Sequence, residues 1–125
     1  MAPVQRSLVC VVDDDESVRE SLPDLLKEFG FSARAFSSAQ EFLSSEVVEN
    51  TKCLILDILM PGMSGLDLQR ELERRGQDIP TVFMSGQWDE ATQAQASKQG
   101  AVKFLCKPFS DAALLDAVNA ALRPR

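Results

Sequence analysis

The chain alternates between short apolar runs and longer segments in which apolar residues have helical spacing. The apolar runs are rich in β-branched residues and end at polar or turn-forming residues, which is typical of β-strands. They predict five strands, at about 7–12, 31–36, 52–57, 80–85 and 102–106. Between them, apolar residues recur every three or four positions and predict helices with one buried face. Two such faces consist of Val18, Leu22, Leu25, Leu26 and Phe29 in the first helix and Leu66, Leu68 and Leu72 in another.

Residues typical of helix ends stand at the boundaries of the helical segments. Glycine readily adopts the left-handed conformation of a C-terminal cap, and it follows three of these segments, at Gly30, Gly76 and Gly100. Ser64 and Ser110 are predicted N-caps, and Asp15 or Glu16 is expected near the N-cap of the first helix. Pro23 falls inside the first helical segment, so we expect a kink near it or a helix that starts late.

Five strands that alternate with five helices predict an α/β fold with a parallel sheet covered by helices on both faces. The runs around Cys10, Cys53 and Cys106 have no polar alternation, so we expect their strands to be buried on both faces. At 125 residues, with 45% hydrophobic and 26% charged residues, the chain is expected to form one domain (1–125) around a substantial core.

The charge balance and the absence of histidine exclude several classes of function. Thirteen Lys and Arg against nineteen Asp and Glu give a net charge of −6, which argues against a dedicated nucleic-acid binder. The chain has no histidine. It therefore lacks any Ser/His or Cys/His nucleophile pair, any His-ligated zinc site and any phosphohistidine of its own.

The sequence predicts a cytoplasmic protein without a membrane segment. The N-terminus lacks the apolar stretch and cleavage site of a signal peptide, and no apolar run approaches the ~20 residues that span a bilayer. The three cysteines each lie in an apolar segment, and their odd number and wide spacing suit neither a disulfide framework nor a zinc site. Buried thiols in a reducing cytosol are the expected state.

Polar or charged residues follow four of the five predicted strands: Asp13-Asp14, Asp57, Ser85-Gly86 and Lys107-Pro108. In an open parallel α/β sheet, ligands bind outside the carboxyl ends of the strands, so these residues are the candidate site. Most have a simpler interpretation alone. Residues 13–16 could be a solvated acidic turn that favours the positive end of the next helix, Lys107 could be a surface lysine, and Ser85 could be a turn residue. Asp57 is harder to dismiss, because a carboxylate that closes an apolar strand is costly unless a cation compensates it.

Together these residues predict a magnesium-dependent aspartyl-phosphate site. Asp13, Asp14 and Asp57 would repel one another unless a hard divalent cation lay among them. Oxygen ligands from few positions, completed by water, suit Mg²⁺ better than a dedicated calcium cage. Lys107 and the Ser85 hydroxyl could then receive an anionic phosphoryl group, for which a carboxylate is a suitable nucleophile.

The sequence resembles the CheY-like receiver domain of two-component response regulators over nearly its whole length. Three motifs occur in the family's order, in residues 9–14 (VCVVDD), 57–65 (DILMPGMSG) and 107–109 (KPF). Residues 36–43 (FSSAQEFL), Met84-Ser85-Gly86 and Lys107-Pro108-Phe109 are most similar to receivers of FixJ-type transcriptional regulators. The resemblance implies a flavodoxin-like (βα)5 doubly wound sandwich with strand order 2-1-3-4-5.

The resemblance also implies a role for each site residue. Asp57 would accept a phosphoryl group from the phosphohistidine of a sensor histidine kinase. Asp57 and Asp14 would bind Mg²⁺ directly, Asp13 would act largely through water, and the backbone carbonyl of Leu59 would be a further ligand. Lys107 would pair with a phosphoryl oxygen.

The same resemblance implies a switch. Ser85 would hydrogen-bond the phosphoryl group and draw its loop inward, and Phe104 occupies the position of an aromatic switch residue, although core packing also explains it. The Lys107–Pro108 peptide bond is expected to be cis, as in the family. Gln87 and Leu59 occupy positions that tune dephosphorylation in receivers, and Trp88 is a surface or interface aromatic.

Phosphorylation is expected to act on the face formed by the fourth helix (89–99), the fifth strand and the fifth helix. The fourth helix is rich in Gln and Ala, so it should be loosely held. This face would control an output domain, with transcription as the expected output, or a partner protein, or would form a homodimer on phosphorylation. The domain itself would contact neither nucleic acid nor membrane. Because the chain stops after the fifth helix, either an output domain is missing or the receiver stands alone.

Two other functions fit some of the same residues. A haloacid-dehalogenase-type phosphatase also uses an Asp nucleophile and Mg²⁺, but it needs a second Asp two residues later, where this chain has Leu59. A receiver-like interaction module without phosphotransfer is the other alternative. We expect a signalling domain that accepts a phosphoryl group and loses it again, and not a dedicated enzyme.

Overall fold

The structure is a computed structural model that describes residues 6–87 and 89–123. Its centre is a five-stranded parallel sheet of order β2-β1-β3-β4-β5, which confirms the predicted fold class. The strand positions agree with the prediction to within one residue. They are β1 (Leu8–Val12), β2 (Ser32–Phe36), β3 (Thr51–Asp57), β4 (Thr81–Ser85) and β5 (Lys103–Cys106).

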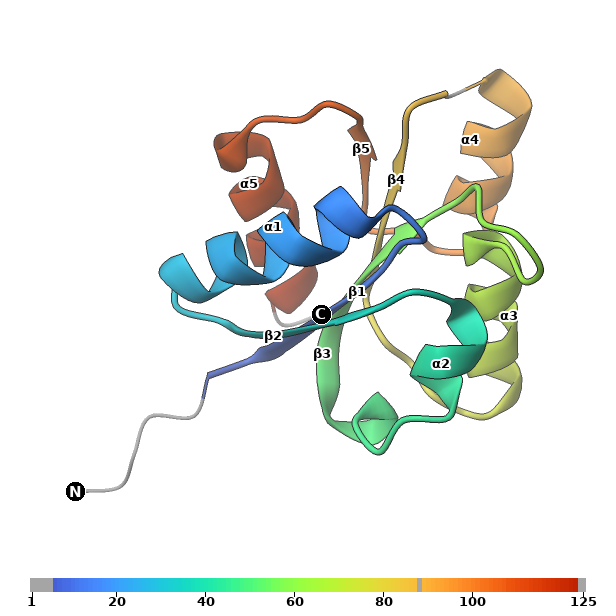
Figure 1. Ribbon diagram of the computed structural model, residues 1–125. Helices are drawn as coiled ribbons and strands as arrows, with labels where there is room; N and C mark the ends of the chain where they lie inside the picture. The colour runs from blue at the N-terminus through green and yellow to red at the C-terminus, as the bar shows by residue number, and fades with distance from the viewer. Residues whose placement is uncertain (1–5, 88, 124–125) are drawn as a thin grey trace.

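Helices cover both faces of the sheet, with α1 and α5 on one face and α2, α3 and α4 on the other (Figure 1). Their bounds are α1 (Glu16–Glu28), α2 (Ala39–Leu43), α3 (Gly65–Arg74), α4 (Glu90–Lys98) and α5 (Asp111–Leu122), with a short 3₁₀ turn at Val48–Asn50. In the described part of the chain, no helix is both long and apolar enough to cross a membrane.

The core has two halves because neighbouring residues of a strand point to opposite faces of the sheet. On β1, Val9 and Val11 pack on the side of α1 and α5, whereas Cys10 and Val12 pack on the side of α2, α3 and α4. The predicted apolar faces of α1 and α3 lie in these two halves. A sheet buried on both faces leaves its strand ends as the places where polar groups can gather.

The predicted helix ends are confirmed. Asp15 caps α1 by accepting a hydrogen bond from the Ser17 N–H, and Ser64 and Ser110 cap α3 and α5. The three glycines after helices have positive φ, with Gly30 at 97°, Gly76 at 76° and Gly100 at 87°. Helix α1 starts at Glu16 and runs through Pro23, so a late start is wrong.

One prediction about burial is wrong. Cys10 and Cys53 are buried, but Cys106 is exposed. Among the strands of the described residues, β5 is last in the sheet order and pairs with β4 alone. It is an edge strand and is not buried on both faces as β1 and β3 are. Lys103 is exposed and Phe104 half-buried, and Leu105 is the only one of the strand's four residues that is buried.

Candidate functional site

The sheet topology brings the predicted site residues to one edge. Asp13 follows β1, Asp57 ends β3, Ser85 ends β4 and Lys107 follows β5. Because all five strands are parallel, their carboxyl ends lie together. Carboxylate oxygens of Asp13, Asp14 and Asp57 lie within 4.8 Å of one another, so residues that are far apart in sequence form one acidic cluster.

Lys107 joins two of these carboxylates. Its Nζ donates hydrogen bonds to Asp13 Oδ2 at 2.7 Å and to Asp57 Oδ2 at 3.2 Å. Burial lowers the pKa of the Lys107 ammonium, but its hydrogen bond to Asp13 and the charges of Asp57 and Asp13 outweigh burial and raise that pKa above 10.5. The side chain is therefore a permanent positive charge between two carboxylates.

Asp57 carries a destabilised negative charge. Its side chain is 9% exposed, and burial, followed by the negative charge of Asp13, raises its pKa to about 6 against the opposing effect of Lys107. Asp13 is fully buried and Asp14 is exposed. Lys107 contacts only two of the three carboxylates, so the cluster keeps an excess of negative charge. Hard oxygen donors with such a charge suit Mg²⁺. The residues present therefore fit a divalent cation.

The loop after Asp57 is folded tightly against the strand end. The Leu59 N–H donates to Asp57 Oδ1 at 3.1 Å, and the Gly65 N–H donates to the Ile58 carbonyl at 3.2 Å. A Cβ atom on Gly65 would lie 2.5 Å from the Asp57 carbonyl oxygen, so only glycine allows the start of α3 to come this close. Ser64 and Asp67 complete a reciprocal capping box there. The chain thus fixes Asp57 through its backbone as well as through its carboxylate.

The structure does not bring the Ser85 hydroxyl into contact with the carboxylates. Ser85 is 1% exposed, and its Oγ donates to the Gln87 carbonyl and accepts from the Gln87 N–H, both at 3.1 Å. Phe104 packs half-buried against the core on the side of α2, α3 and α4. The Lys107–Pro108 peptide bond is cis, as the resemblance implied. Trp88 lies outside the described residues.

Two contributors to the site were not predicted from the sequence. Arg19 donates from α1 to the Asp13 carbonyl, a contact between residues six apart that no motif indicates. Gly65 belongs to the 57–65 motif, but its steric role is visible only where α3 meets the end of β3. The spacing of Gly65 from Asp57 was available in the sequence, whereas the direction of the Arg19 side chain was not.

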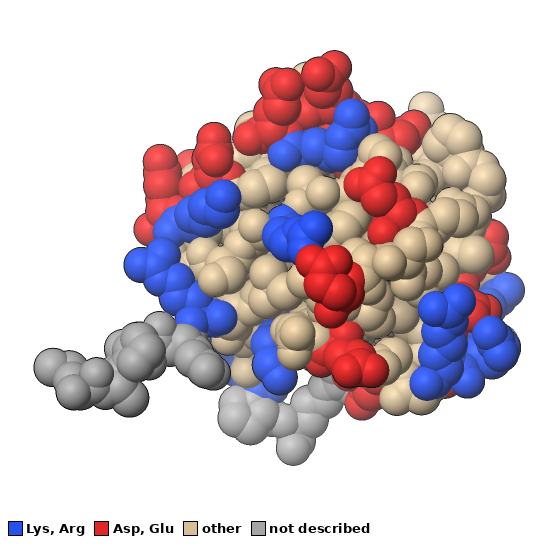
Figure 2. Space-filling view, turned by 60° about the horizontal axis from the view of Figure 1, so that its bottom comes forward, with Lys and Arg blue, Asp and Glu red and all other residues tan. Residues whose placement is uncertain are grey.

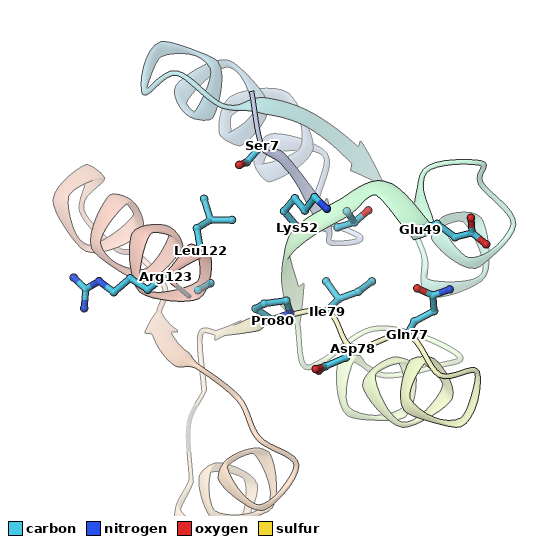
Figure 3. A pocket seen from close by; sticks show the side chains of 11 residues that line it. Ser7, Glu49, Lys52, Gln77, Asp78, Ile79, Pro80, Leu122 and Arg123 are labelled. Carbon is cyan, nitrogen blue, oxygen red and sulfur yellow. The ribbon is translucent and has the colours of Figure 1, made fainter. Parts of the chain in front are cut away.

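The opposite end of the sheet has a pocket of different character. It measures about 380 Å³ and lies where β3 and β4 begin and α5 ends (Figure 3). Lys52, Asp78 and Arg123 are among its lining residues, and none of the predicted site residues is. Acidic and basic side chains are interspersed over the face seen in Figure 2, without a large patch of one sign. The cluster of Asp13, Asp14 and Asp57 lies at the carboxyl end of the sheet and not at this pocket.

Comparison with known proteins identifies the class of this fold and site. Residues 9–119 match the response regulator receiver domain. The chain belongs to this family, whose members are receivers of two-component signalling. At the level of individual proteins, it is 48% identical to Nodulation protein W of Bradyrhizobium diazoefficiens over 93% of this chain and 51% of that protein. It is 44% identical to the transcriptional regulatory protein FixJ of Azorhizobium caulinodans over 91% of this chain and 54% of that protein.

Solved structures agree. The response regulator StyR superposes with a TM-score of 0.85 at 46% identity, over 92% of this chain and 58% of that one. FixJ-N superposes with a TM-score of 0.84 at 36% identity, over 95% of each chain. The chain spans about half the length of the curated relatives it matches. It covers nearly all of FixJ-N, so the likeness to these relatives is to a receiver unit.

Proposed function

We propose that this domain accepts a phosphoryl group on Asp57 and that the acyl phosphate changes the face formed by α4, β5 and α5. The observation that carries the proposal is the juxtaposition of Asp57, Asp13 and Lys107, in which one ammonium contacts two buried carboxylates beside a third. Membership of the receiver family supports the same chemistry.

The reaction is a transfer between two nucleophiles. A carboxylate oxygen of Asp57 attacks the phosphorus, the new O–P bond forms, and the N–P bond to the kinase imidazole breaks; the imidazole nitrogen leaves with its electron pair. We propose that Lys107 pairs with a phosphoryl oxygen, and its contact with Asp57 Oδ2 supports this role. Asp14, Asp57, Asp13 through water and the Leu59 carbonyl are proposed to hold Mg²⁺. When bound, the cation neutralises charge on the carboxylates and on the transferring group.

The switch is proposed to begin at Ser85. Its hydroxyl is occupied by the Gln87 backbone, so it can bond a phosphoryl oxygen only by giving up those two hydrogen bonds. The exchange would move the chain that leads into α4, while Phe104 on β5 adjusts its packing. A ligand shifts such an equilibrium only by its differential affinity for the two arrangements, and an acyl phosphate adds charge and acceptors that favour one of them.

The family and the relatives support the proposed partners. A receiver of this family works with a sensor kinase and an output domain. Several relatives, such as TdiR of Thauera aromatica, are transcriptional regulatory proteins about twice as long as this chain. We propose that the face of α4, β5 and α5 controls such an output, a separate effector or a second copy. Nucleic-acid contact is assigned to the output and not to this acidic domain, which acts as a signalling switch and not as a dedicated enzyme.

Phosphate incorporation tests the proposal. The 125-residue chain is incubated with acetyl phosphate, with or without Mg²⁺, and its intact mass is measured. We expect one phosphoryl group per chain, located on Asp57. It should not form when excess chelator removes Mg²⁺ beforehand, nor in Asp57→Asn. Asp116→Asn, which removes an exposed carboxylate of α5, is the matched control and should be phosphorylated normally.

Other outcomes distinguish the alternatives. Absence of phosphate from both acetyl phosphate and a cognate kinase would leave an interaction module without phosphotransfer. Steady turnover of unrelated phosphomonoesters would indicate a phosphatase instead. Fluorescence of Trp88, the only tryptophan, offers a second readout, and we expect it to change with acetyl phosphate in the wild type and not in Asp57→Asn.

A further inference from the structure

Arg19 reaches back from α1 to the end of β1. Its Nη1 donates a hydrogen bond of 3.1 Å to the backbone carbonyl oxygen of Asp13, and the residue is half-buried. That carbonyl belongs to the peptide group that joins Asp13 to Asp14. Arg19 therefore holds the link between two of the three carboxylates of the acidic cluster.

The other polar groups of Asp13 are also held. Its N–H donates to the Phe36 carbonyl at 3.1 Å, its Oδ1 accepts from the Asp15 N–H at 2.9 Å, and its Oδ2 accepts from Lys107 at 2.7 Å. Arg19 supplies the contact that remains, at the carbonyl. Asp14 is exposed, so burial does not fix its side chain. The orientation of the Asp13–Asp14 peptide group therefore helps to set where the Asp14 carboxylate lies.

The charge of Arg19 and its hydrogen bond should act in opposite directions on a bound cation. A guanidinium near a cation site repels the cation, so its charge alone weakens binding. The hydrogen bond fixes the backbone between two ligand-bearing residues, and such supporting contacts typically strengthen metal affinity. Removal of Arg19 therefore weakens cation binding if the hydrogen bond dominates and strengthens it if the charge dominates.

We propose that Arg19 is a positioning residue for the divalent-cation site and that its hydrogen bond to the Asp13 carbonyl outweighs its charge. The guanidinium sets the placement of the Asp14 carboxylate relative to those of Asp13 and Asp57. This inference rests on the proposed function, in which these carboxylates hold Mg²⁺.

The test measures Mg²⁺ affinity by titration calorimetry in four proteins without phosphate present. Arg19→Met removes both charge and donor while keeping much of the side-chain length, and Arg19→Lys keeps the charge. Lys27→Met is the matched control, because it removes a positive charge from the last turn of the same helix. We expect Arg19→Met to bind Mg²⁺ about tenfold more weakly than the wild type. Arg19→Lys should fall between them, and Lys27→Met should equal the wild type.

The outcomes separate this inference from the function on which it rests. If the wild type binds Mg²⁺ and Arg19→Met binds it equally or more tightly, the positioning role is wrong and the proposed site stands. If the wild type itself does not bind Mg²⁺, both fail. Should Arg19→Met not fold, Arg19→Lys decides: weakened binding with the charge retained supports the role, and wild-type affinity contradicts it.

Discussion

Helices α3 and α4 lie on the same face of the sheet, yet they are held very differently. Helix α3 buries five of its residues: Gly65, Leu66, Leu68, Gln69 and Leu72. Helix α4, nearly as long, buries only Ala96. The first follows Asp57, the proposed phosphoacceptor, and the second follows Ser85, the proposed switch residue. The domain therefore combines a firmly packed support beneath the chemistry with a helix that can move at low cost.

The C-terminal end of α4 is tied to α3 by polar contacts. Gln99, just after α4, donates from Nε2 to the Leu66 carbonyl at 3.2 Å and to Gln69 Oε1 at 2.9 Å. Its Oε1 accepts from Arg70 Nε at 3.0 Å. At the other end, α4 follows the turn closed by Ser85 and Gln87. Helix α4 is thus anchored at the end distant from the proposed switch.

The largest expected change in the free energy of unfolding comes from a substitution that disrupts the packing of α3. Leu68 is fully buried, so Leu68→Ala should lower the free energy of unfolding by about 2–5 kcal/mol through lost burial and an added cavity. Ala96→Gly removes the one buried side chain of α4 and should cost only about 1 kcal/mol. Urea unfolding of both variants measures the difference. Equal costs would contradict the contrast between the helices.

A methyl group at Gly65 tests the close contact between α3 and β3. Gly65→Ala should lower the free energy of unfolding by about 1–3 kcal/mol, because the new Cβ meets the Asp57 backbone and the helix must shift. It should also weaken Mg²⁺ binding. Gly86→Ala is the matched control, since its Cβ would meet no atom within 4 Å, and it should be nearly neutral. If Gly65→Ala left the free energy of unfolding unchanged, the contact between Gly65 and Asp57 would not be a tight constraint.

Neutralising Asp57 separates the charge of the site from its packing. The pKa of Asp57 in the folded protein, about 6, lies above its ordinary 3.8. Between about pH 4 and pH 6, the folded state therefore keeps the Asp57 proton that the unfolded chain has lost. The stability that this protonation contributes disappears as pH rises through that range. Metal-free Asp57→Asn should be more stable than the wild type by about 1 kcal/mol at pH 7.5, with a smaller gain at pH 4.5.

Denaturant unfolding at the two pH values, with chelator present, measures this gain. Asp116→Asn is the control, because its carboxylate is exposed and its pairing with Lys103 is long, at 3.8 Å. A gain that is equal at both pH values, or a loss at pH 7.5, would contradict the assignment of a destabilised charge to Asp57.

The smallest effect on overall stability concerns the anchor of α4. Gln99→Ala should cost about 0.5 kcal/mol, because it removes a few hydrogen bonds in a partly exposed place. Amide exchange in α4 should nevertheless become several-fold faster, while exchange in α3 stays the same. Gln93→Ala, an exposed position in the same helix, is the control. Unchanged exchange in α4 would show that Gln99 is not its anchor.

The strand ends could be predicted because a parallel topology brings them together whatever the loops do. This placed Asp13, Asp57, Ser85 and Lys107 at one edge of the sheet. The exposure of Cys106 was missed because the apolar pattern of an edge strand resembles that of a central one. The contacts of Arg19 and Gln99 depend on how long side chains lie across neighbouring elements, which residue spacing does not determine. The roles of the site residues stay predictions until phosphorylation is measured.

Hydrogen exchange of α3 and α4, with and without beryllofluoride as a stable phosphoryl mimic, tests the central claim most directly. In the free protein with Mg²⁺, α4 should exchange about tenfold or more faster than α3. Beryllofluoride should then change exchange in α4 and in the turn from Ser85 to Gln87, leave α3 unchanged, and have no effect in Asp57→Asn. If α4 is as protected as α3, or if its exchange ignores beryllofluoride bound at Asp57, the proposed link between Asp57 and α4 is wrong.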